Sequence, residues 1–352
     1  MHKNKEVFII STLIALYMCI NVLLIGFFTG KWNGLDGVFP LYFILTVPVV
    51  TGLSLVKNPM KALVLGCRIA TIVFALFSIY SLIENSAQRA GFGTNAIIAA
   101  YFLMVFACVS RFQIKDTEQP KVGVIYFYLG FISAVATGTR IVILFYITAI
   151  VLEVFFIIHK AIRKNGSAGK NIALVFLLSC VFAFLLIKYS DVLRLESSLT
   201  AITSGNILLD GAIKQRLYMW EFGWNTFLQN SLLGIGAANI HGEVSVYMKQ
   251  VHNISFAARH LHNVFIHELA AHGIIGAGLL LVCHYLVYNR TIGYFKGLPN
   301  KHSLYLLFLG ILIYGLTGSH LTDDRMILIT IFVFAVLIKT TEKLPKPSNP
   351  IQ

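Results

Sequence analysis

The chain has 352 residues, of which 57% are hydrophobic and only 12% are charged, and its mean hydropathy is +0.78. Soluble globular proteins carry about 25% charged residues, so the composition excludes a water-exposed surface over the whole chain and predicts an integral membrane protein. The formal net charge is +13. We attribute this excess to cytoplasmic loops and not to nucleic-acid binding.

Long apolar runs occur throughout the sequence. A membrane-spanning helix needs about 20 mostly apolar residues. We therefore predict an all-α, polytopic fold with about ten transmembrane helices at 7–29, 38–56, 62–83, 94–110, 122–138, 141–158, 171–188, 264–288, 303–319 and 325–339. The five cysteines fall inside these runs without a CxxC pair, which is typical of small buried hydrophobic residues.

The loops between these runs differ in charge. With the N-terminus in the cytoplasm, the short cytoplasmic segments hold seventeen Lys and Arg residues and the short external segments hold four. This bias predicts that both termini are cytoplasmic. The expected organisation is transmembrane helices 1–7 within 1–188, a long external loop at 189–263, transmembrane helices 8–10 within 264–339, and a cytoplasmic tail at 340–352.

The long external loop contains one helical pattern, at 214–229. Leu217, Trp220, Trp224 and Phe227 are spaced to share one face of that helix. Two interpretations stay open. The helix lies at the level of the lipid headgroups, where tryptophan is favoured, or its tryptophan face packs into the core of an external domain.

Arginines gather at the external ends of several predicted spans, at Arg89, Arg140, Arg216 and Arg325. A single boundary arginine is usually an anchor whose charged end reaches the membrane surface. Several arginines on the external side of the membrane could instead bind one phosphate group together, because a guanidinium is a rigid fork of hydrogen-bond donors that stays charged.

Histidines crowd the end of the external loop and the span after it, at His241, His252, His260, His262, His267 and His272. Zinc is not predicted, because His267 and His272 lie five residues apart and not at the i, i+4 spacing of a zinc-binding helix. His260 and His262 either face water near a helix start or provide a general base.

Several blocks, taken in order, resemble the O-antigen ligase family of lipopolysaccharide assembly, the enterobacterial type in particular. His262-Asn263, nine residues and Gly273-Ile274-Ile275-Gly276 match the family's H[NSQ]-x9-GxxG signature. Further similar blocks are His260-Leu261, Thr137-Gly138-Thr139-Arg140, Gln215-Arg216-Leu217-Tyr218-Met219-Trp220-Glu221, Arg89 to Asn95, and Gly234-Ile235-Gly236. The chain departs from the family in having about ten predicted spans, where members usually have about twelve.

The resemblance implies a bacterial inner-membrane glycosyltransferase with its active site on the periplasmic face. The donor would be an undecaprenyl-diphosphate-linked glycan, and the acceptor a sugar of the lipid A core. His262 would be the catalytic base, Arg140 and Arg216 would bind the diphosphate, and the supporting residues would be Arg89, His260, Asn263 and Arg325. Neither cofactor nor metal is expected, since the donor is already activated and arginines would stabilise the leaving group.

Two alternatives remain. The same superfamily includes O-antigen polymerases and protein O-oligosaccharyltransferases, which use the same kind of donor with a different acceptor. A membrane transporter would carry charges near the middle of its spans. Only Arg68 and Glu153 occupy such positions here, which favours chemistry at the external surface.

Overall fold

The structure is a computed structural model that describes residues 45–84, 89–114, 120–164, 210–255, 258, 260–295, 301–318 and 320–343, with scattered residues within 12–28 and 177–208. Every regular element in this part of the chain is a helix, which confirms the all-α prediction there. The chain divides into two compact units. We call them the α4–α7 unit and the α11–α13 unit.

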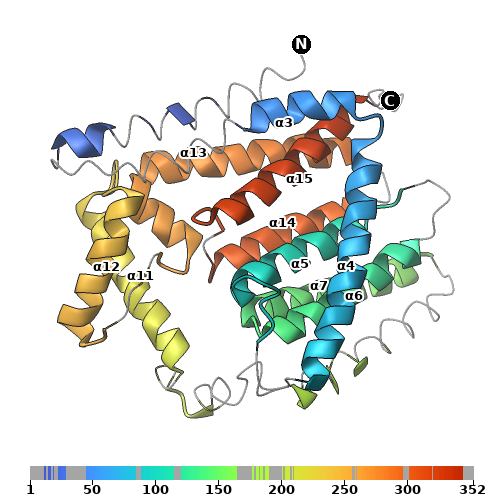
Figure 1. The fold of residues 1–352 in the computed structure, drawn as a ribbon, viewed down its shortest axis with the longest axis horizontal. Coiled ribbons are helices and arrows are strands. Elements are labelled where there is room, and N and C mark those ends of the chain that lie inside the picture. Colours follow the sequence, from blue (N-terminus) through green and yellow to red (C-terminus); the bar gives the residue numbers. More distant parts are fainter. Residues whose placement is uncertain are drawn as a thin grey trace. The chain divides into compact units, whose positions relative to one another are not determined.

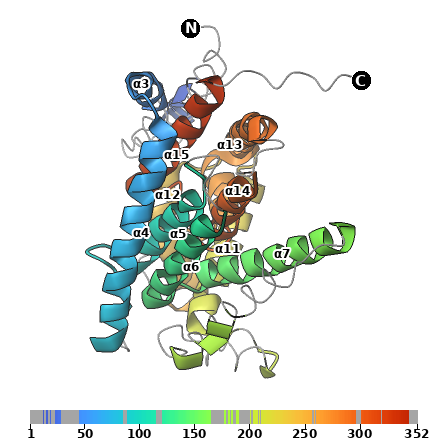
Figure 2. The ribbon, with the colours of Figure 1, turned by 90° about the vertical axis from the view of Figure 1, so that its right-hand side faces the viewer.

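The elements in chain order are α3 Thr46–Gly52, η3 Leu53–Leu55, α4 Pro59–Glu84, α5 Ala96–Ser110, α6 Pro120–Thr137, α7 Arg140–Lys164, α11 Gly211–Gln229, α12 Ala237–His252, α13 Val264–Phe295, α14 Lys301–Gly315 and α15 Asp324–Lys343. Figures 1 and 2 show them in two views. More than half of each of the predicted spans 7–29 and 171–188 lies outside the described residues.

Some of these helices are long and apolar enough to cross a membrane, and others are shorter. Pro59–Glu84 and Val264–Asn289 are long and apolar enough to cross a membrane. Three shorter helices, Ala96–Ser110, Val122–Thr137 and His302–Gly315, are also apolar. A membrane protein is therefore consistent with the described helices, and the count of ten spans stays a prediction.

The α4–α7 unit contains α5, α6, α7, α14 and most of α4. α5 and α6 pack closely because Gly130 leaves room for them: a Cβ there would meet the Ala107 Cβ at 2.5 Å. Aromatic side chains fill the centre, where Phe127 of α6 lies 4.8 Å from Tyr146 of α7 between ring centroids. α14 joins them through the Tyr314 hydroxyl, which donates to the Ile97 carbonyl at 3.1 Å.

The two charges predicted within spans of this unit both have protein partners. Arg68 donates through Nε to the Ser110 carbonyl at 3.1 Å and through Nη2 to the Phe112 carbonyl at 3.0 Å. It therefore satisfies carbonyls at the C-terminus of α5 that no intrahelical amide can reach. Glu153 forms an ion pair with Arg111.

The α11–α13 unit is built around a core shared by α11, α12 and the start of α13. Its fully buried members are Met219, Phe222, Ile240, Val244, Met248, Ala258, Leu261, Ala270 and Ala271. A smaller cluster joins α3 and η3 to α15 through Val50, Leu53, Ala335 and Val336.

The predicted helix at 214–229 is confirmed as α11, and the face that carries its two tryptophans is only partly buried. The buried positions are Met219, Phe222, Gly223 and Thr226, whereas Trp224 is 49% exposed. Gly223 explains why this face of α11 can pack so closely, because a Cβ there would meet the Leu261 Cδ1 at 2.4 Å. On the predicted face, Trp224 is thus exposed while Trp220 is half-buried, and both interpretations of that face stay predictions.

Candidate functional site

The helix α13 is broken at Gly273 into a first segment, residues 264–272, and a second segment, residues 274–295. A helix break frees amides and carbonyls that must find other partners. The Ile235 and Gly236 amides donate to the Ala270 and Ala271 carbonyls at 3.0 and 2.8 Å. On the other side of the break, the Ile274 amide donates to the Ser231 carbonyl at 2.8 Å.

Two glycines make this junction possible. Gly273 has φ +64°, and a Cβ there would lie 2.2 Å from the Leu232 carbonyl oxygen. Gly234 has φ +71°, and a Cβ there would lie 2.4 Å from the Ala271 carbonyl carbon. The glycines of the GxG and GxxG blocks therefore lock the 231–236 turn into the break in α13, which fixes the first segment of α13 against α11 and α12.

His262 is held at the start of that first segment. The Asn263 side-chain oxygen accepts hydrogen bonds from the Phe265 and Ile266 amides at 3.0 and 3.1 Å, as an N-cap does. His262 itself has φ +51°, in the left-handed region that costs a non-glycine residue about 1–3 kcal/mol. Such strain is retained only where the surrounding structure enforces it, so the imidazole is aimed by its backbone.

The His262 imidazole has two basic neighbours. Its ring lies 4.3 Å from the ring of His260 between centroids, and Arg216 on α11 acts on it electrostatically. Burial is the largest cause that lowers the pKa of His262 to about 3, followed by His260 and Arg216. The ring is therefore neutral at pH 7, the form that can accept a proton.

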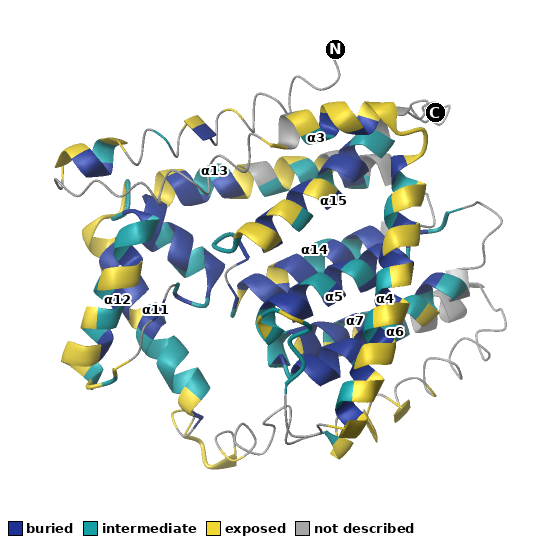
Figure 3. Cartoon of the chain, in the orientation of Figure 1, coloured by how far each residue is buried: buried dark blue, intermediate teal, exposed yellow. Residues whose placement is uncertain are grey.

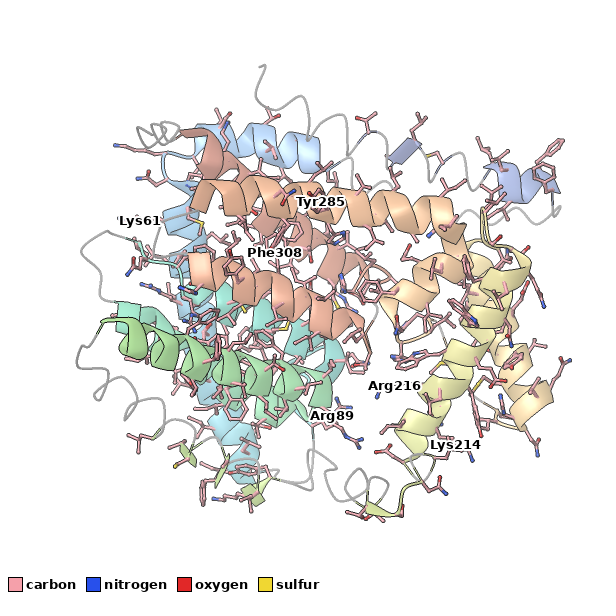
Figure 4. All side chains as sticks on the ribbon, turned by 180° about the vertical axis from the view of Figure 1, so that it is seen from behind. Lys61, Arg89, Lys214, Arg216, Tyr285 and Phe308 are labelled. Atoms are coloured by element: carbon pink, nitrogen blue, oxygen red, sulfur yellow. The ribbon has the colours of Figure 1, made fainter. Side chains whose placement is uncertain are left out.

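The Nδ1 atom of His262 is buried and has no hydrogen-bond partner among the described residues. A buried polar atom left unpaired costs about 1–3 kcal/mol. A substrate hydroxyl donated to this nitrogen would remove that cost. Figure 4 shows Arg216 projecting from α11, so the α11–α13 unit offers an imidazole base with a guanidinium nearby.

Arg89 and Arg140 lie in the α4–α7 unit, where Arg89 organises the turn before α7. Arg89 donates through Nε to the Thr137 carbonyl at 2.8 Å and through Nη2 to the Thr139 hydroxyl at 3.0 Å. Gly138 in that turn has φ +60°. These bonds give Arg89 a positioning role: it sets where α7 begins, and so where Arg140 stands.

Arg140 occupies the first position of α7 and pairs with Asp210 at 2.5 Å. A cation at a helix N-terminus is disfavoured by the helix dipole unless an anion accompanies it. The Asp210 side chain, only 3% exposed, supplies that anion. The N-terminus of α7 and its arginine therefore already accommodate one negative group, as helix N-termini commonly do for phosphates.

The other predicted site residue, Arg325, belongs to the α11–α13 unit and has local partners. Its Nη2 lies 2.8 Å from Asp323, and the side chain is half exposed. This agrees with the boundary-anchor interpretation.

Sequence reasoning missed two acidic partners. Asp210 was overlooked although it stands directly before the helix that carries Arg216. The other is Glu268, which lies 2.8 Å from the Nδ1 of His272 one helical turn later. Their i, i+4 spacing within one helix was a readable signal for that contact.

One segment of the chain, which holds most of the candidate site residues, matches a known family. Residues 125–281 match the family model described as O-antigen ligase. The segment contains Arg140, Asp210, Arg216, His262 and the Gly273 break, whereas Arg89 and Arg325 lie outside it. No curated protein sequence matches the chain.

Proposed function

We propose that the chain transfers an undecaprenyl-diphosphate-linked O-antigen glycan to a sugar of the lipid A core. The match of residues 125–281 to the family model described as O-antigen ligase supports this proposal. Members of this family are bacterial inner-membrane enzymes of the glycosyltransferase type that act in lipopolysaccharide biosynthesis. The finer steps of the proposal are the donor, the acceptor, the periplasmic location of the site and the roles of its residues.

In the proposed reaction, His262 accepts the proton of an acceptor sugar hydroxyl as that oxygen attacks the anomeric carbon of the donor glycan. The bond between the anomeric carbon and the diphosphate oxygen breaks, and its electron pair leaves with the lipid diphosphate. The configuration at the anomeric carbon is inverted. No nucleotide is consumed, because the diphosphate ester is already an activated leaving group.

Arg216 would stabilise the charge that develops on the departing diphosphate. Removing one such preorganised donor typically costs an enzyme about 3–4 kcal/mol of transition-state stabilisation. The observation that carries the proposal is the proximity of Arg216 to a neutral, buried imidazole at His262. The arginine suits a phosphate and the imidazole suits a hydroxyl proton.

Arg140 is proposed as a second diphosphate ligand. The support for this role is its place at the N-terminus of α7, where it already binds the carboxylate of Asp210. A diphosphate would compete with that carboxylate for the guanidinium. Arg89 is proposed to act through the turn it holds and not by touching the substrate.

A transporter is less well supported. The two charges within predicted spans, Arg68 and Glu153, are engaged by backbone carbonyls and by Arg111 respectively. Charges that line a transport path would instead face a substrate or an ion.

The experiment that tests the proposal is deletion of the gene, followed by complementation and gel analysis of lipopolysaccharide. We expect the deletion to remove all O-antigen from the core while lipid-linked polymer accumulates, and His262→Ala to fail to restore it. His241→Ala is the matched control, because His241 is an exposed residue of α12, and it should complement fully. A single repeat unit left on the core would identify a polymerase instead, and full ligation by His262→Ala would remove His262 from the mechanism.

A further inference from the structure

A second apolar stripe runs along α11 on the side turned away from its core. Trp224 and Leu228 lie one turn apart and are 49% and 60% exposed, and Leu232 in the following turn is 64% exposed. The opposite side of the same helix carries the buried residues Met219 and Phe222. A helix with one apolar face in a core and another left bare requires something to cover the second face.

The bare stripe continues directly onto the second segment of α13. The Ile274 amide donates to the Ser231 carbonyl, and the Ile275 amide approaches the Leu232 carbonyl at 3.5 Å. Ile274 and Ile275 are themselves 55% and 47% exposed. Exposed apolar residues recur along this segment (Figure 3), which belongs to a helix long and apolar enough to cross a membrane.

Several backbone polar groups at this junction are paired within the protein. The amides of Ile235, Gly236 and Ile274 and the carbonyls that they reach at the break in α13 are paired with one another. Irregular backbone is tolerated near hydrocarbon only where its polar groups are satisfied in this way. The junction is therefore suited to lie at the border between lipid and water.

The direction of α11 agrees with that position. α11 and α12 run crosswise to the second segment of α13 (Figure 1). If that segment crosses the bilayer, α11 lies along the membrane surface. Glu221 and Asn225 are exposed polar residues on one side of the apolar stripe, and an interfacial helix combines exposed polar and apolar residues in this way.

We propose that the outer stripe, formed by Trp224 and Leu228 of α11 and Leu232 of the following turn, docks onto the outer leaflet of the bilayer at the boundary between headgroups and acyl chains. Where the proposed transferase function holds, this docking keeps Arg216, two turns earlier on the same helix, at the height at which the diphosphate of a lipid-linked donor lies. The docking itself rests only on α13 crossing the membrane.

The three tryptophans of the chain allow a direct test. One full-length variant combines Trp32→Phe with Trp220→Phe and keeps Trp224 as the sole tryptophan. The matched variant combines Trp32→Phe with Trp224→Phe and keeps Trp220, which is half-buried with its indole nitrogen shut off from solvent. Both are reconstituted into phosphatidylcholine vesicles whose acyl chains carry bromine close to the headgroup.

We expect the brominated lipid to quench Trp224 strongly, at a depth of about 5–10 Å into the headgroup boundary, and iodide in the buffer to leave it nearly unchanged. Trp220 should be quenched less by the lipid. Quenching of Trp224 by iodide and not by lipid would overturn the proposal, as would protection of Trp224 from both quenchers, which would mean that protein covers the stripe. Because fluorescence does not depend on glycan transfer, these outcomes are independent of whether the protein is a ligase.

Discussion

At the scale of single residues, the proposed chemistry depends on a histidine that cannot easily become charged. His262 stays neutral because it is buried and faces His260 and Arg216. A bound diphosphate would place negative charge beside it and would raise the pKa of His262 toward its ordinary value. The ring would thus become a stronger base only when the donor is present.

The HN-x9-GxxG signature was enough to predict His262 and Asn263 as candidates from the sequence, and it also predicted a helix start beside them. It did not predict the left-handed backbone at His262 or the closeness of Arg216. Both depend on the packing of α11 against α13, which brings together residues far apart in the sequence.

Exchange of arginine for lysine tests whether the guanidinium groups act on phosphate. We expect Arg216→Lys and Arg140→Lys each to lower ligation by about tenfold or more, because lysine keeps the charge but loses the bidentate fork. The measurement is the rate of glycan transfer at fixed protein level. Arg325→Lys is the control, because Arg325 is half exposed and pairs with Asp323, and it should retain normal transfer. Normal transfer by both test variants would reduce Arg140 and Arg216 to boundary anchors.

At the scale of elements, the apolar runs predicted most helices within a few residues, since length and hydrophobicity determine where a helix can be buried. The sequence predicted a continuous span at 264–288, and the break inside it went unseen. The reason is that Gly273 ends the first segment only because the 231–236 turn supplies replacement hydrogen bonds. A lone glycine within a helical pattern is normally tolerated.

The same tertiary context decides which side of α11 is most deeply buried. Its tryptophans marked a clear apolar face, yet the helix packs through Met219, Phe222 and the small Gly223. Close approach to Leu261 requires that glycine. Amphipathic spacing shows that an apolar face exists but not which partner covers it.

The break in α13 can be tested through its glycine. Gly273→Ala would combine a positive φ with a methyl group 2.2 Å from a backbone carbonyl, so we expect a loss of roughly 3 kcal/mol or more of folding stability. Thermal unfolding of the purified protein in detergent measures it. Gly278→Ala is the matched control, because a Cβ there meets nothing within 4 Å, and its unfolding temperature should stay the same or rise. Equal unfolding temperatures for the two variants would mean that the break does not hold the fold.

At the scale of the whole molecule, the candidate site residues belong to two separate units. The α11–α13 unit carries the imidazole and Arg216, and the α4–α7 unit carries Arg140 at the start of α7 together with its acidic partner Asp210. Composition alone predicted a membrane protein, and the motif blocks predicted the family whose model matches residues 125–281. The division into units was not predictable, because each unit combines helices from distant parts of the chain.

The most direct measurement of the central claim uses the purified protein in vesicles that contain undecaprenyl-diphosphate-linked glycan and lipid A core, without nucleotide. We predict that the wild-type protein moves glycan onto the core and releases undecaprenyl diphosphate in equal amount, and that the His262→Ala protein does neither. Glycan transfer that proceeds at the wild-type rate without His262, or donor that stays intact with the wild-type protein, would contradict the account.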